Sequence, residues 1–387
     1  VPANYLIAHD QFKLPIKAPV KKYTAQGPQL KISDRNNLLT ASSSKVSFVF
    51  DKKTGIITSY KVDGIEYFQD GFGIQPNFWR APSDNDYGNG APTRLQVWKQ
   101  SSKDFNVVEA TIEKEGQTAV IHANYLLAAG NLYMVTYKIY PTGVVNVNAH
   151  FTSVSMEATP DEISEATKTD TFSPKSQAAR EDAAKLEVPR IGVRFRLPAD
   201  MQQVQYFGRG PEENYLDRQA GTIVGLYTTT AEKMYYPYVR PQENGHHTDT
   251  RWVALTGKNG KGLLIRANET MGFNALRNSI EDFDSEEAVK HDYQWSNFTE
   301  KEIAERNPEK AKNRLRRMHH VNDISPRNFV EVCVDMKQQG VAGYDSWGSR
   351  PEKAYSIPAN QNYTWGFTLV PVKNNNEAAS KATLTYE

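Results

Sequence analysis

The chain has 387 residues, and its 46 Lys and Arg residues almost balance its 45 Asp and Glu residues. A surface so close to neutral offers no broad field that would attract a nucleic acid or an anionic membrane, so we expect neither partner. No run of about 18 apolar residues occurs, which argues against a membrane-spanning helix. The single cysteine, Cys333, excludes an internal disulfide and a site built from several thiolates.

The N-terminal residues predict a processed product or a fragment, because the chain opens on Val1 rather than on a methionine. Any export signal would then precede Val1, so the sequence leaves the compartment open between cytoplasm and periplasm. Residues 7–15 predict a short strand, and residues 15–29, rich in Pro, Lys and Gly, predict a linker. The predicted divisions are therefore residues 1–28, a main domain over 29–375, and a C-terminal tail over 376–387.

Most of the chain alternates apolar and polar residues in short runs separated by turns. Residues 45–68 contain three such runs, divided by Lys53–Gly55 and Asp63-Gly64, and this pattern predicts a meander of strands. The same pattern returns in residues 131–152, 190–198 and 251–267. Since strands are not alternating with helices, we predict an all-β fold, a large antiparallel sandwich or barrel.

Two segments break the alternation. Residues 156–187 are polar and charged, and they predict an excursion between strands. Residues 301–317 combine helix-forming residues with Pro308, and their basic end predicts a solvated face. Cys333, by contrast, lies in the alternating stretch FVEVCVDMK, so we expect it to be buried and unreactive.

The first of three polar, aromatic-rich clusters covers residues 75–92. It combines Trp79 and Arg80 with Asp84–Asp86 and two glycines, which is typical of an ordered loop that leads into a mobile one. One interpretation is structural, with an Asx turn and Arg80 paired to a carboxylate. A calcium loop is the weaker alternative, because the spacing and final glutamate of an EF-hand are absent.

The second cluster consists of two stretches, residues 206–218 and 235–252. Paired carboxylates can serve glycoside hydrolysis, but Glu212 and Glu213 are consecutive, so we expect one to face away from the other. His246 and His247 are also consecutive, and neighbours on a strand point to opposite faces, which argues against a shared metal ion.

The third cluster is GVAGYDSWGSRP, residues 340–351, in which Gly343 and Gly348 flank Trp347. Packing of the indole into a small hydrophobic cluster is one explanation. A platform that stacks on a flat, partly apolar ligand is the other, because recognition concentrates on loops held by a rigid scaffold. Gly-rich phosphate loops and Ser or Cys nucleophile motifs are absent from the sequence, so recognition is better represented than catalysis.

These clusters together resemble one known family. Four stretches, in this order, resemble the successive motifs of the C-terminal small-chain domain of bacterial β-galactosidases of glycoside hydrolase family 2: NFWRAPSDNDYGNG, YFGRGPEENYLDR, YYPYVRPQENGHHTDTRW and GYDSWG. The leading IAHDQFKLP also resembles the last strand of the immunoglobulin-like domain that precedes this one in the family. The resemblance implies a large antiparallel super-sandwich similar to galactose mutarotase.

The resemblance also implies a division of labour. In the family, the acid/base and nucleophile glutamates and the divalent and monovalent metal ions belong to a TIM barrel, and this sequence has no segment that predicts such a barrel. We therefore expect no catalytic residue, metal or cofactor in this chain. Its expected partners are the catalytic barrel domain and a galactoside substrate, and alone it should not hydrolyse galactosides.

Site residues are carried over by motif. Trp347 matches the tryptophan that stacks on the incoming sugar, and its neighbour Asp345 is expected to contact substrate as well. Gly88 matches the hinge glycine of a mobile active-site loop, which here continues through Asn89 and Gly90 to Pro92. A further set is expected to knit loops together or to touch sugar: Arg80, Asp84, Asn85, Glu243, Asn244 and His246.

Two other functions remain open. A free-standing carbohydrate-binding module would use the concave face of the sandwich. An aldose epimerase is suggested only by analogy of fold, and it would need a general acid and a general base in one cleft. The available candidates for that chemistry are His246, His247, His319 and Glu243.

Overall fold

The computed structural model describes residues 9–16, 21–128, 130–153, 187–284, 305, 320–345 and 348–386. The expected excursion over 156–187 falls outside these residues except for Glu187. Residues 301–317, whose basic end is predicted to be a solvated face, also lie outside them, except for Glu305.

A five-stranded antiparallel meander forms the first sheet, in the order β2-β3-β4-β5-β6. Its strands are β2 (Lys31–Arg35), β3 (Leu38–Ser42), β4 (Val46–Asp51), β5 (Ile56–Val62) and β6 (Ile65–Glu66). Asp63 and Gly64 connect β5 to β6 with φ of 49° and 82°. Two positive φ values in a two-residue hairpin are what Asp-Gly provides, so the meander and its turn are confirmed.

A twelve-stranded sheet makes up most of the molecule. Its main path runs β14-β13-β15-β16-β18-β11-β10-β9-β8, while β17 joins β16 to β12, and β12 joins β7. The strands are β7 (Gln75–Asn77), β8 (Asn106–Glu115), β9 (Thr118–Leu126), β10 (Leu132–Ile139), β11 (Val145–Thr152), β12 (Arg190–Pro198), β13 (Gln203–Gly210), β14 (Ile223–Thr230), β15 (His247–Thr256), β16 (Gly262–Leu276), β17 (Phe329–Gln338) and β18 (Tyr363–Val372). Every pairing in this sheet is antiparallel, which confirms the predicted all-β antiparallel fold.

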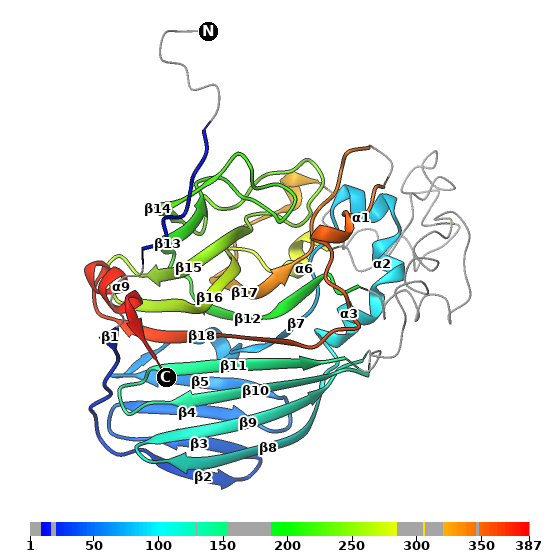
Figure 1. The fold of residues 1–387 in the computed structure, drawn as a ribbon. Coiled ribbons are helices and arrows are strands. Elements are labelled where there is room, and N and C mark those ends of the chain that lie inside the picture. Colours follow the sequence, from blue (N-terminus) through cyan, green and yellow to red (C-terminus); the bar gives the residue numbers. More distant parts are fainter. Residues whose placement is uncertain are drawn as a thin grey trace.

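Helical segments are short and lie outside the sheets (Figure 1). They are η1 (Gln69–Gly71), α1 (Asp84–Gly88), α2 (Ala91–Arg94), α3 (Gln96–Ser101), α6 (Ile280–Phe283), η2 (Val321–Asp323), η3 (Lys353–Tyr355) and α9 (Asn375–Ala382). Within the described residues, none has the length and apolar character to cross a membrane. Helices α1 to α3 gather at one end of the large sheet, where the candidate site lies.

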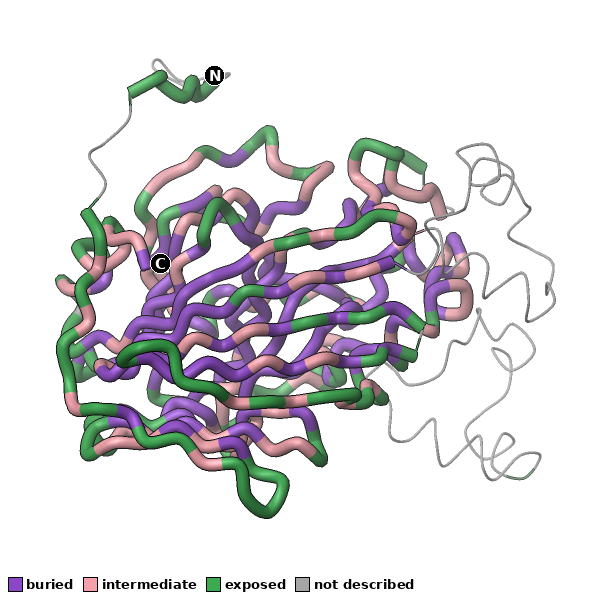
Figure 2. The backbone as a smooth tube through the Cα atoms, turned by 60° about the horizontal axis from the view of Figure 1, so that its bottom comes forward, coloured by how far each residue is buried: buried purple, intermediate pink, exposed green. Residues whose placement is uncertain are grey.

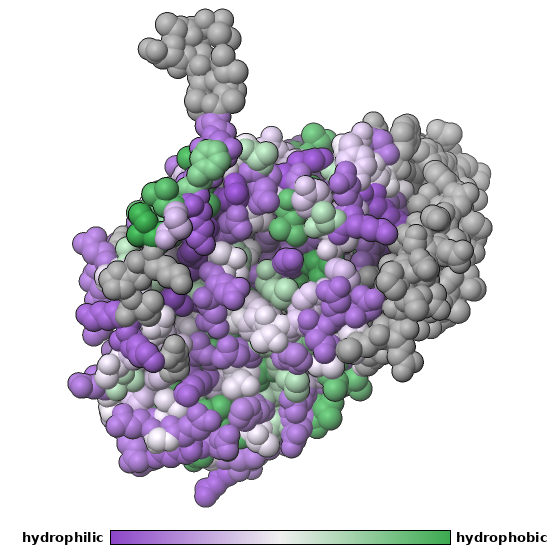
Figure 3. All heavy atoms as spheres, in the orientation of Figure 1, coloured by the Kyte–Doolittle hydropathy of each residue, from purple (hydrophilic) through white to green (hydrophobic). Residues whose placement is uncertain are grey.

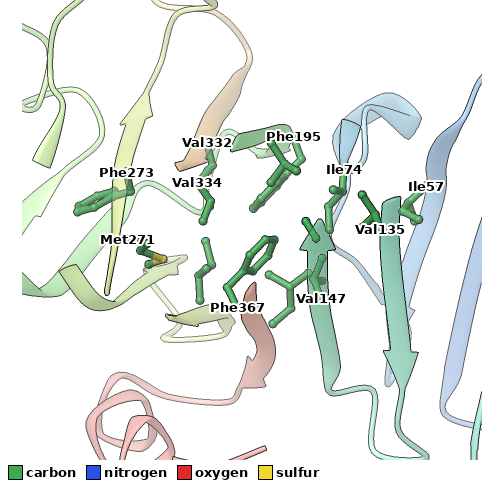
Figure 4. Packing of buried hydrophobic residues seen from close by; sticks show 14 of the residues in the cluster. Ile57, Ile74, Val135, Val147, Phe195, Met271, Phe273, Val332, Val334 and Phe367 are labelled. Atoms are coloured by element: carbon green, nitrogen blue, oxygen red, sulfur yellow. The ribbon is translucent and has the colours of Figure 1, made fainter. Parts of the chain in front are cut away.

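One hydrophobic core joins the two sheets. Ile57 of the small sheet, Val135 and Val147 of β10 and β11, and Phe195 of β12 all belong to a single buried cluster that continues to Phe273 of β16 (Figure 4). Strands through the middle of the molecule are therefore mostly buried, and exposed residues gather on outer strands and loops (Figure 2). Cys333 on β17 is buried here, as predicted, and burial raises the pKa of its thiol well above the usual range.

Described segments near the two ends of the chain pack against each other on the domain. Residues 376–387, predicted to be a tail, contain most of α9 and then β19 (Leu384–Thr385), which pairs in parallel with β1 (Lys21–Lys22) inside the expected linker. Tyr386 is buried in a second apolar cluster, and its ring lies 4.7 Å from that of Tyr23. The sequence did not predict β1 or β19, because each strand has only two residues and its partner lies near the other end of the chain.

The N-terminal stretch 9–16 runs beside strand β14 without forming a strand. The Gln11 side-chain amide exchanges two hydrogen bonds with the backbone of Val224, at 2.8 and 2.7 Å. Phe12 and Leu14 in this stretch are exposed, and so is Leu226 on strand β14. Elsewhere on the face seen in Figure 3, hydrophilic residues predominate and hydrophobic groups are small.

Candidate functional site

The three sequence clusters meet at one end of the large sheet. The chain from Gln339 to Asp345 leaves strand β17 and passes between the α1 region and the loop that carries Asp217. The Asp217 carboxylate accepts hydrogen bonds from the backbone of Val341 and Ala342, at 2.9 and 2.7 Å. Because the two amides occupy both carboxylate oxygens, the loop is held at Val341 and Ala342 through its backbone.

Arg80 anchors the same loop from below. Its guanidinium makes a two-bond ion pair with Asp86, at 3.1 and 3.0 Å, and donates to the carbonyl oxygens of Gln339 and Gly340, at 2.7 and 3.0 Å. Arg80 is only 2% exposed. This confirms the structural interpretation, in which Arg80 pairs with a carboxylate, and it commits the guanidinium to the protein rather than to a sugar.

The segment expected to be a mobile Gly-rich loop, residues 88–92, runs from the last residue of α1 through a turn at Asn89 and Gly90 into α2. Asp84–Gly88 forms α1, which Ser83 begins with a capping box: its hydroxyl accepts from the amide of Asp86, and Asp86 accepts from the amide of Ser83. Gly88 has no positive φ, whereas Gly90 has φ of 72° between α1 and α2. Within this segment the left-handed backbone that favours glycine is therefore at Gly90 and not at Gly88.

Gly348 lies against the end of α1. Its φ is 107°, and a Cβ added there would come within 2.3 Å of the carbonyl carbon of Gly88 and 2.5 Å of the amide nitrogen of Asn89. The side-chain amide of Asn89 also donates to the carbonyl oxygen of Ser349, at 3.4 Å. Only glycine fits such an approach, so the GYDSWG motif and the α1 motif are in direct contact.

Trp347, the expected sugar-stacking residue, lies outside the described residues. Its neighbour Asp345 is exposed, and one carboxylate oxygen accepts a hydrogen bond from the amide of Ser349, at 3.1 Å. This bond closes the loop around the motif. The described residues on both sides thus fix where the motif leaves and rejoins the α1 end of the molecule.

A pocket of about 440 Å³ opens beside this loop. It is lined by Ser83, Asn85, Tyr215, Arg218, Tyr238, Gln242, Glu243, Val341, Ala342, Gly343, Tyr344 and Asp345. All three sequence clusters contribute to the lining. The volume falls within the range of about 300–1,000 Å³ that is usual for small-molecule sites.

Glu243 brings a charge to the pocket wall. Its Oε1 accepts from Arg190, at 2.8 Å, and from the side chain of Asn274, at 3.0 Å. Arg190 in turn lies 3.3 Å from the Asp335 carboxylate, and all three charged side chains are buried. Burial alone would lower the pKa of Arg190, but Asp335 and Glu243 raise it overall. Burial raises the pKa of Asp335 to about 7, an effect that Arg190 opposes and Glu243 reinforces.

The two histidines take up separate structural positions. His246 is bonded through Nδ1 to the Asn274 side chain, at 2.9 Å, and stacks on Tyr215 with ring centroids 5.5 Å apart. His247 contacts the carbonyl oxygens of Gly245 and Pro211. Burial lowers the pKa of both, that of His246 to about 3, with the charge of Arg190 adding to the shift.

The two glutamates of the second cluster diverge, as predicted. Glu212 is exposed. Glu213 is half-buried; its carboxylate accepts from the amide of Gly245, at 2.6 Å, and from the Tyr238 hydroxyl. Burial raises the pKa of Glu213, while these two hydrogen bonds lower it in part.

The remaining candidates divide between the pocket and the scaffold. Asn85 lines the pocket and donates to the carbonyl oxygen of Val341, at 3.0 Å. Asn244 bonds the backbone of Tyr236 and Gln242 and serves the scaffold. Asp84 is exposed and faces Gln242. Because Asp86 is committed to Arg80 and Ser83, the run Asp84–Asp86 does not assemble a calcium loop.

Sequence reasoning did not single out three of the pocket residues, namely Tyr215, Tyr238 and Gln242. All of them lie within the three clusters. The available signal in the sequence was a tyrosine flanked by carboxylate and amide residues. Which of these tyrosines line one pocket depends on contacts between residues that are more than a hundred positions apart in the chain. Among the described residues, His, Cys, Asp and Glu form no group of three that could hold a metal ion.

Comparisons with known proteins agree with the family resemblance seen in the sequence. Residues 42–369 match the family model described as β-galactosidase small chain. The chain is 30% identical over 372 residues to a β-galactosidase from Priestia megaterium and 24% identical over 375 residues to one from Streptococcus thermophilus, covering 96% of this chain in each case. It spans about 30% of the length of these curated relatives.

Similar solved structures are more distant. A putative aldose 1-epimerase from Escherichia coli is 9% identical, with a TM-score of 0.40, and covers 89% of this chain and 99% of its own. A galactose mutarotase related enzyme from Lactobacillus acidophilus is 10% identical, with a TM-score of 0.41, and covers 87% and 98%. Likeness at this level carries no conclusion about function.

Proposed function

Because this chain belongs to the β-galactosidase small-chain family, we propose that it is the C-terminal portion of a β-galactosidase that removes terminal β-D-galactose from β-galactosides. In this proposal the retaining chemistry takes place on a catalytic barrel outside this chain, together with the metal ions of the parent enzyme. The chain itself carries neither a catalytic residue nor a cofactor, and it is inactive alone.

The contact between Gly348 and the end of α1 is the observation that carries this proposal. It joins two motifs, separated by more than two hundred residues, into one surface beside an open pocket. In the proposal, that surface faces the barrel and presents Trp347 to the sugar. Gly88, Asn89 and Gly90 form the adjacent segment that adjusts when the substrate enters. An indole suits this role, because the C–H groups of a sugar face pack on an aromatic ring without needing a charge.

The state of the carboxylates around the pocket supports a role without catalysis. A retaining glycosidase needs a free nucleophile and a free acid about 5–5.5 Å apart. Here Glu243 is paired with Arg190, Glu213 accepts from Tyr238 and Gly245, and Asp217 holds two backbone amides. Each of these groups is committed to the scaffold and therefore poorly suited to attack a substrate.

An epimerase is less well supported. It would need an accessible histidine that gains and loses a proton near neutral pH. His246 and His247 are 1% and 2% exposed, and burial lowers the pKa of each. His319 lies outside the described residues. The epimerase alternative therefore lacks a usable acid or base among the described histidines of the second cluster.

The test is reconstitution of hydrolysis. The chain is mixed with a separately produced portion of the parent enzyme that contains the barrel, and nitrophenyl-β-galactoside hydrolysis is followed. We expect activity on mixing, a large loss with Trp347→Ala and a partial return with Trp347→Phe, since a phenyl ring keeps part of the stacking surface. Equal activity in all three mixtures would remove Trp347 from the site.

A further inference from the structure

Asp335 on β17 is a buried carboxylate without a hydrogen-bond donor. It is 0% exposed, and neither of its oxygens accepts a hydrogen bond from any residue that the structure describes. Arg190 Nε lies 3.3 Å from its Oδ2, but the two atoms do not form a hydrogen bond. Keeping an ionised carboxylate in such a place is costly in free energy unless its charge is fully compensated.

Two neighbouring strands enclose this carboxylate. Asp335 pairs with Gly192 of β12 and with Gly272 of β16. A Cβ added at Gly192 would lie 2.2 Å from Asp335 Oδ1, so the carboxylate fills the space that a side chain would take there. The carboxylate therefore has little room to turn toward another donor, and a bound proton is the direct way to remove its charge.

The charges around Asp335 do not balance when it is ionised. Arg190 faces it from β12, and the same guanidinium pairs with the buried Glu243 carboxylate, at 2.8 Å. Arg80, a second buried cation in the region, is committed to Asp86. Among the described residues, one guanidinium thus serves two buried carboxylates. Carboxylates that share a site and a single cation cannot both ionise at their usual pKa, so the pair keeps a proton to a higher pH.

Other titratable side chains beside Asp335 add no charge near neutral pH. His246 Nδ1 lies 3.8 Å from Oδ2, and burial lowers the pKa of this histidine to about 3. Cys333 on β17 and Tyr133 on β10 are uncharged too, because burial raises the pKa of each above its usual range. The excess negative charge therefore stays uncompensated unless a proton binds.

Arg190 connects these carboxylates to the loop beside the pocket. Its Nη2 donates to the side chains of Glu243 and of Gln338, the last residue of β17. Residues 339–345 follow directly along the chain. A movement of the guanidinium toward Asp335 would therefore weaken a contact at the start of this loop.

We propose that Arg190, Asp335 and Glu243 form a proton-binding cluster that makes the hold on residues 339–345 depend on pH. With the proton bound, Arg190 keeps its bonds to Glu243 and Gln338. When the proton passes to solvent, ionised Asp335 attracts Arg190 Nε and weakens those bonds. In agreement, burial raises the pKa of Asp335 to about 7, an effect that Arg190 opposes and Glu243 reinforces. Residues 339–345 should be held less firmly above about pH 7 than below it.

Infrared spectroscopy of the 387-residue chain detects the proton directly, because the C=O stretch of a protonated carboxyl group is separate from the bands of a carboxylate. At about pH 6 we expect a protonated carboxyl in the unmodified chain that is missing from Asp335→Asn. Asp249→Asn, which removes a partly exposed carboxylate outside the cluster, is the comparison. Glu243→Gln leaves Arg190 with one carboxylate, so the Asp335 proton should be released at least about one pH unit lower than in the unmodified chain.

Urea unfolding measures the same proton by its effect on stability. The folded chain holds a proton that the unfolded chain has released at the usual Asp pKa of about 3.9. This stabilisation is therefore complete below about pH 4 and is lost as the pH rises through about 7. Relative to Asp335→Asn, the unfolding equilibrium constant of the unmodified chain should increase by up to about tenfold per pH unit over that range. His246, whose contribution has the opposite sign, is present in both chains.

Amide exchange at about pH 6 and about pH 8.5 measures the effect on the loop, and comparing two chains at one pH cancels the intrinsic pH dependence of exchange. The amides of Gln339 and Gly340 are bonded to backbone carbonyls. Their rates should be alike in the unmodified chain and Asp335→Asn at the lower pH, and about tenfold faster in the unmodified chain at the higher pH. The Tyr67 amide, bonded to β5 in the small sheet, should show no such difference.

Thermal melting shows whether each variant folds. If Asp335→Asn does not fold, the infrared titration of Glu243→Gln against the unmodified chain decides. Absence of the protonated carboxyl, an unchanged release pH in Glu243→Gln, or equal exchange at Gln339 and Gly340 in both chains at the higher pH would overturn the proposal. None of these measurements uses hydrolysis, so their outcome is independent of the proposed function.

Discussion

Gly348 touches the backbone of Gly88 so closely that a single added carbon would lie 2.3 Å from the Gly88 carbonyl carbon. This contact joins the loop that follows strand β17 to the end of helix α1. The positions of Asp345 on one side and of α1 on the other both depend on it. Its loss should therefore disturb the pocket and the proposed barrel-facing surface together.

Gly348→Ala should destabilise the chain and lower reconstituted hydrolysis. The substitution meets both a strained positive φ and a clash with fixed backbone. Gly64→Ala is the matched control, because Gly64 also has positive φ, at 82°, but nothing lies within 4 Å of its added Cβ. We expect Gly64→Ala to cost roughly 1 kcal/mol of unfolding free energy and to leave activity intact. Equal losses of activity in the two variants would mean that the Gly88 contact is unimportant.

Arg80→Ala should be among the most destabilising single changes in this chain. It leaves the buried carboxylate of Asp86 without its cation and frees two carbonyl oxygens, so we expect a loss of about 3–5 kcal/mol in urea unfolding. Arg240→Ala is the comparison, since its ion pair with Asp84 is exposed and spans 3.7 Å. That pair should contribute about 1 kcal/mol or less. A small effect of Arg80→Ala would contradict the assigned anchoring role.

His246 should contribute a loss of stability as the pH falls from about 6.5 toward 3. Burial lowers the folded-state pKa of His246 to about 3, below its usual 6.5, so the unfolded chain binds a proton in this window that the folded chain cannot. One such group changes the unfolding free energy by at most about 1.4 kcal/mol per pH unit.

Urea unfolding between about pH 7 and pH 4 measures this contribution. His246→Asn keeps a donor near the Nδ1 position for Asn274 and removes the titration, so its stability should depend less steeply on pH than that of the unmodified chain. His122→Asn, at a partly exposed site on β9, is the comparison for loss of a histidine outside the buried cluster around Arg190. A His246→Asn slope as steep as the original would show that His246 is not held neutral.

Asp217→Asn should loosen residues 341–345 without unfolding the domain. An asparagine side chain has one accepting oxygen where the carboxylate has two, so the backbone amide of either Val341 or Ala342 loses its acceptor. We expect amide exchange at these two positions to quicken by about tenfold, which corresponds to roughly 1.4 kcal/mol. Asp249→Asn, which alters a partly exposed ion pair with Arg209, should leave that exchange unchanged. Unchanged exchange in Asp217→Asn would mean that other contacts hold the loop.

Much of the fold was accessible from the sequence because its strands are locally encoded. Alternation over residues 45–68 and the Asp63-Gly64 turn specify a meander without reference to the rest of the chain. Helix α1 was missed, although Ser83 and Asp86 have the spacing of a capping box, because its five residues include an asparagine and a glycine that favour turns. Strand β19 carried no signal, since its partner is at the other end of the chain.

The site was predictable in its parts and not in its assembly. The motifs that contain Arg80, Asp217 and Gly348 could each be found in the sequence. That Arg80 would bind Gln339 and Gly340, and that Asp217 would bind Val341 and Ala342, depends on tertiary contacts that local patterns do not encode. These contacts determine the roles, because they make Arg80 and Asp217 anchors of residues 339–342.

The most direct test of the central claim is hydrolysis of nitrophenyl-β-galactoside by the purified 387-residue chain alone. We expect a rate no greater than that of buffer, because the carboxylates around the pocket are committed to Arg190, Tyr238 and backbone amides. Turnover by this chain, retained after a second purification step and abolished by substitution of one of its own carboxylates, would contradict the claim that its catalysis belongs to another domain.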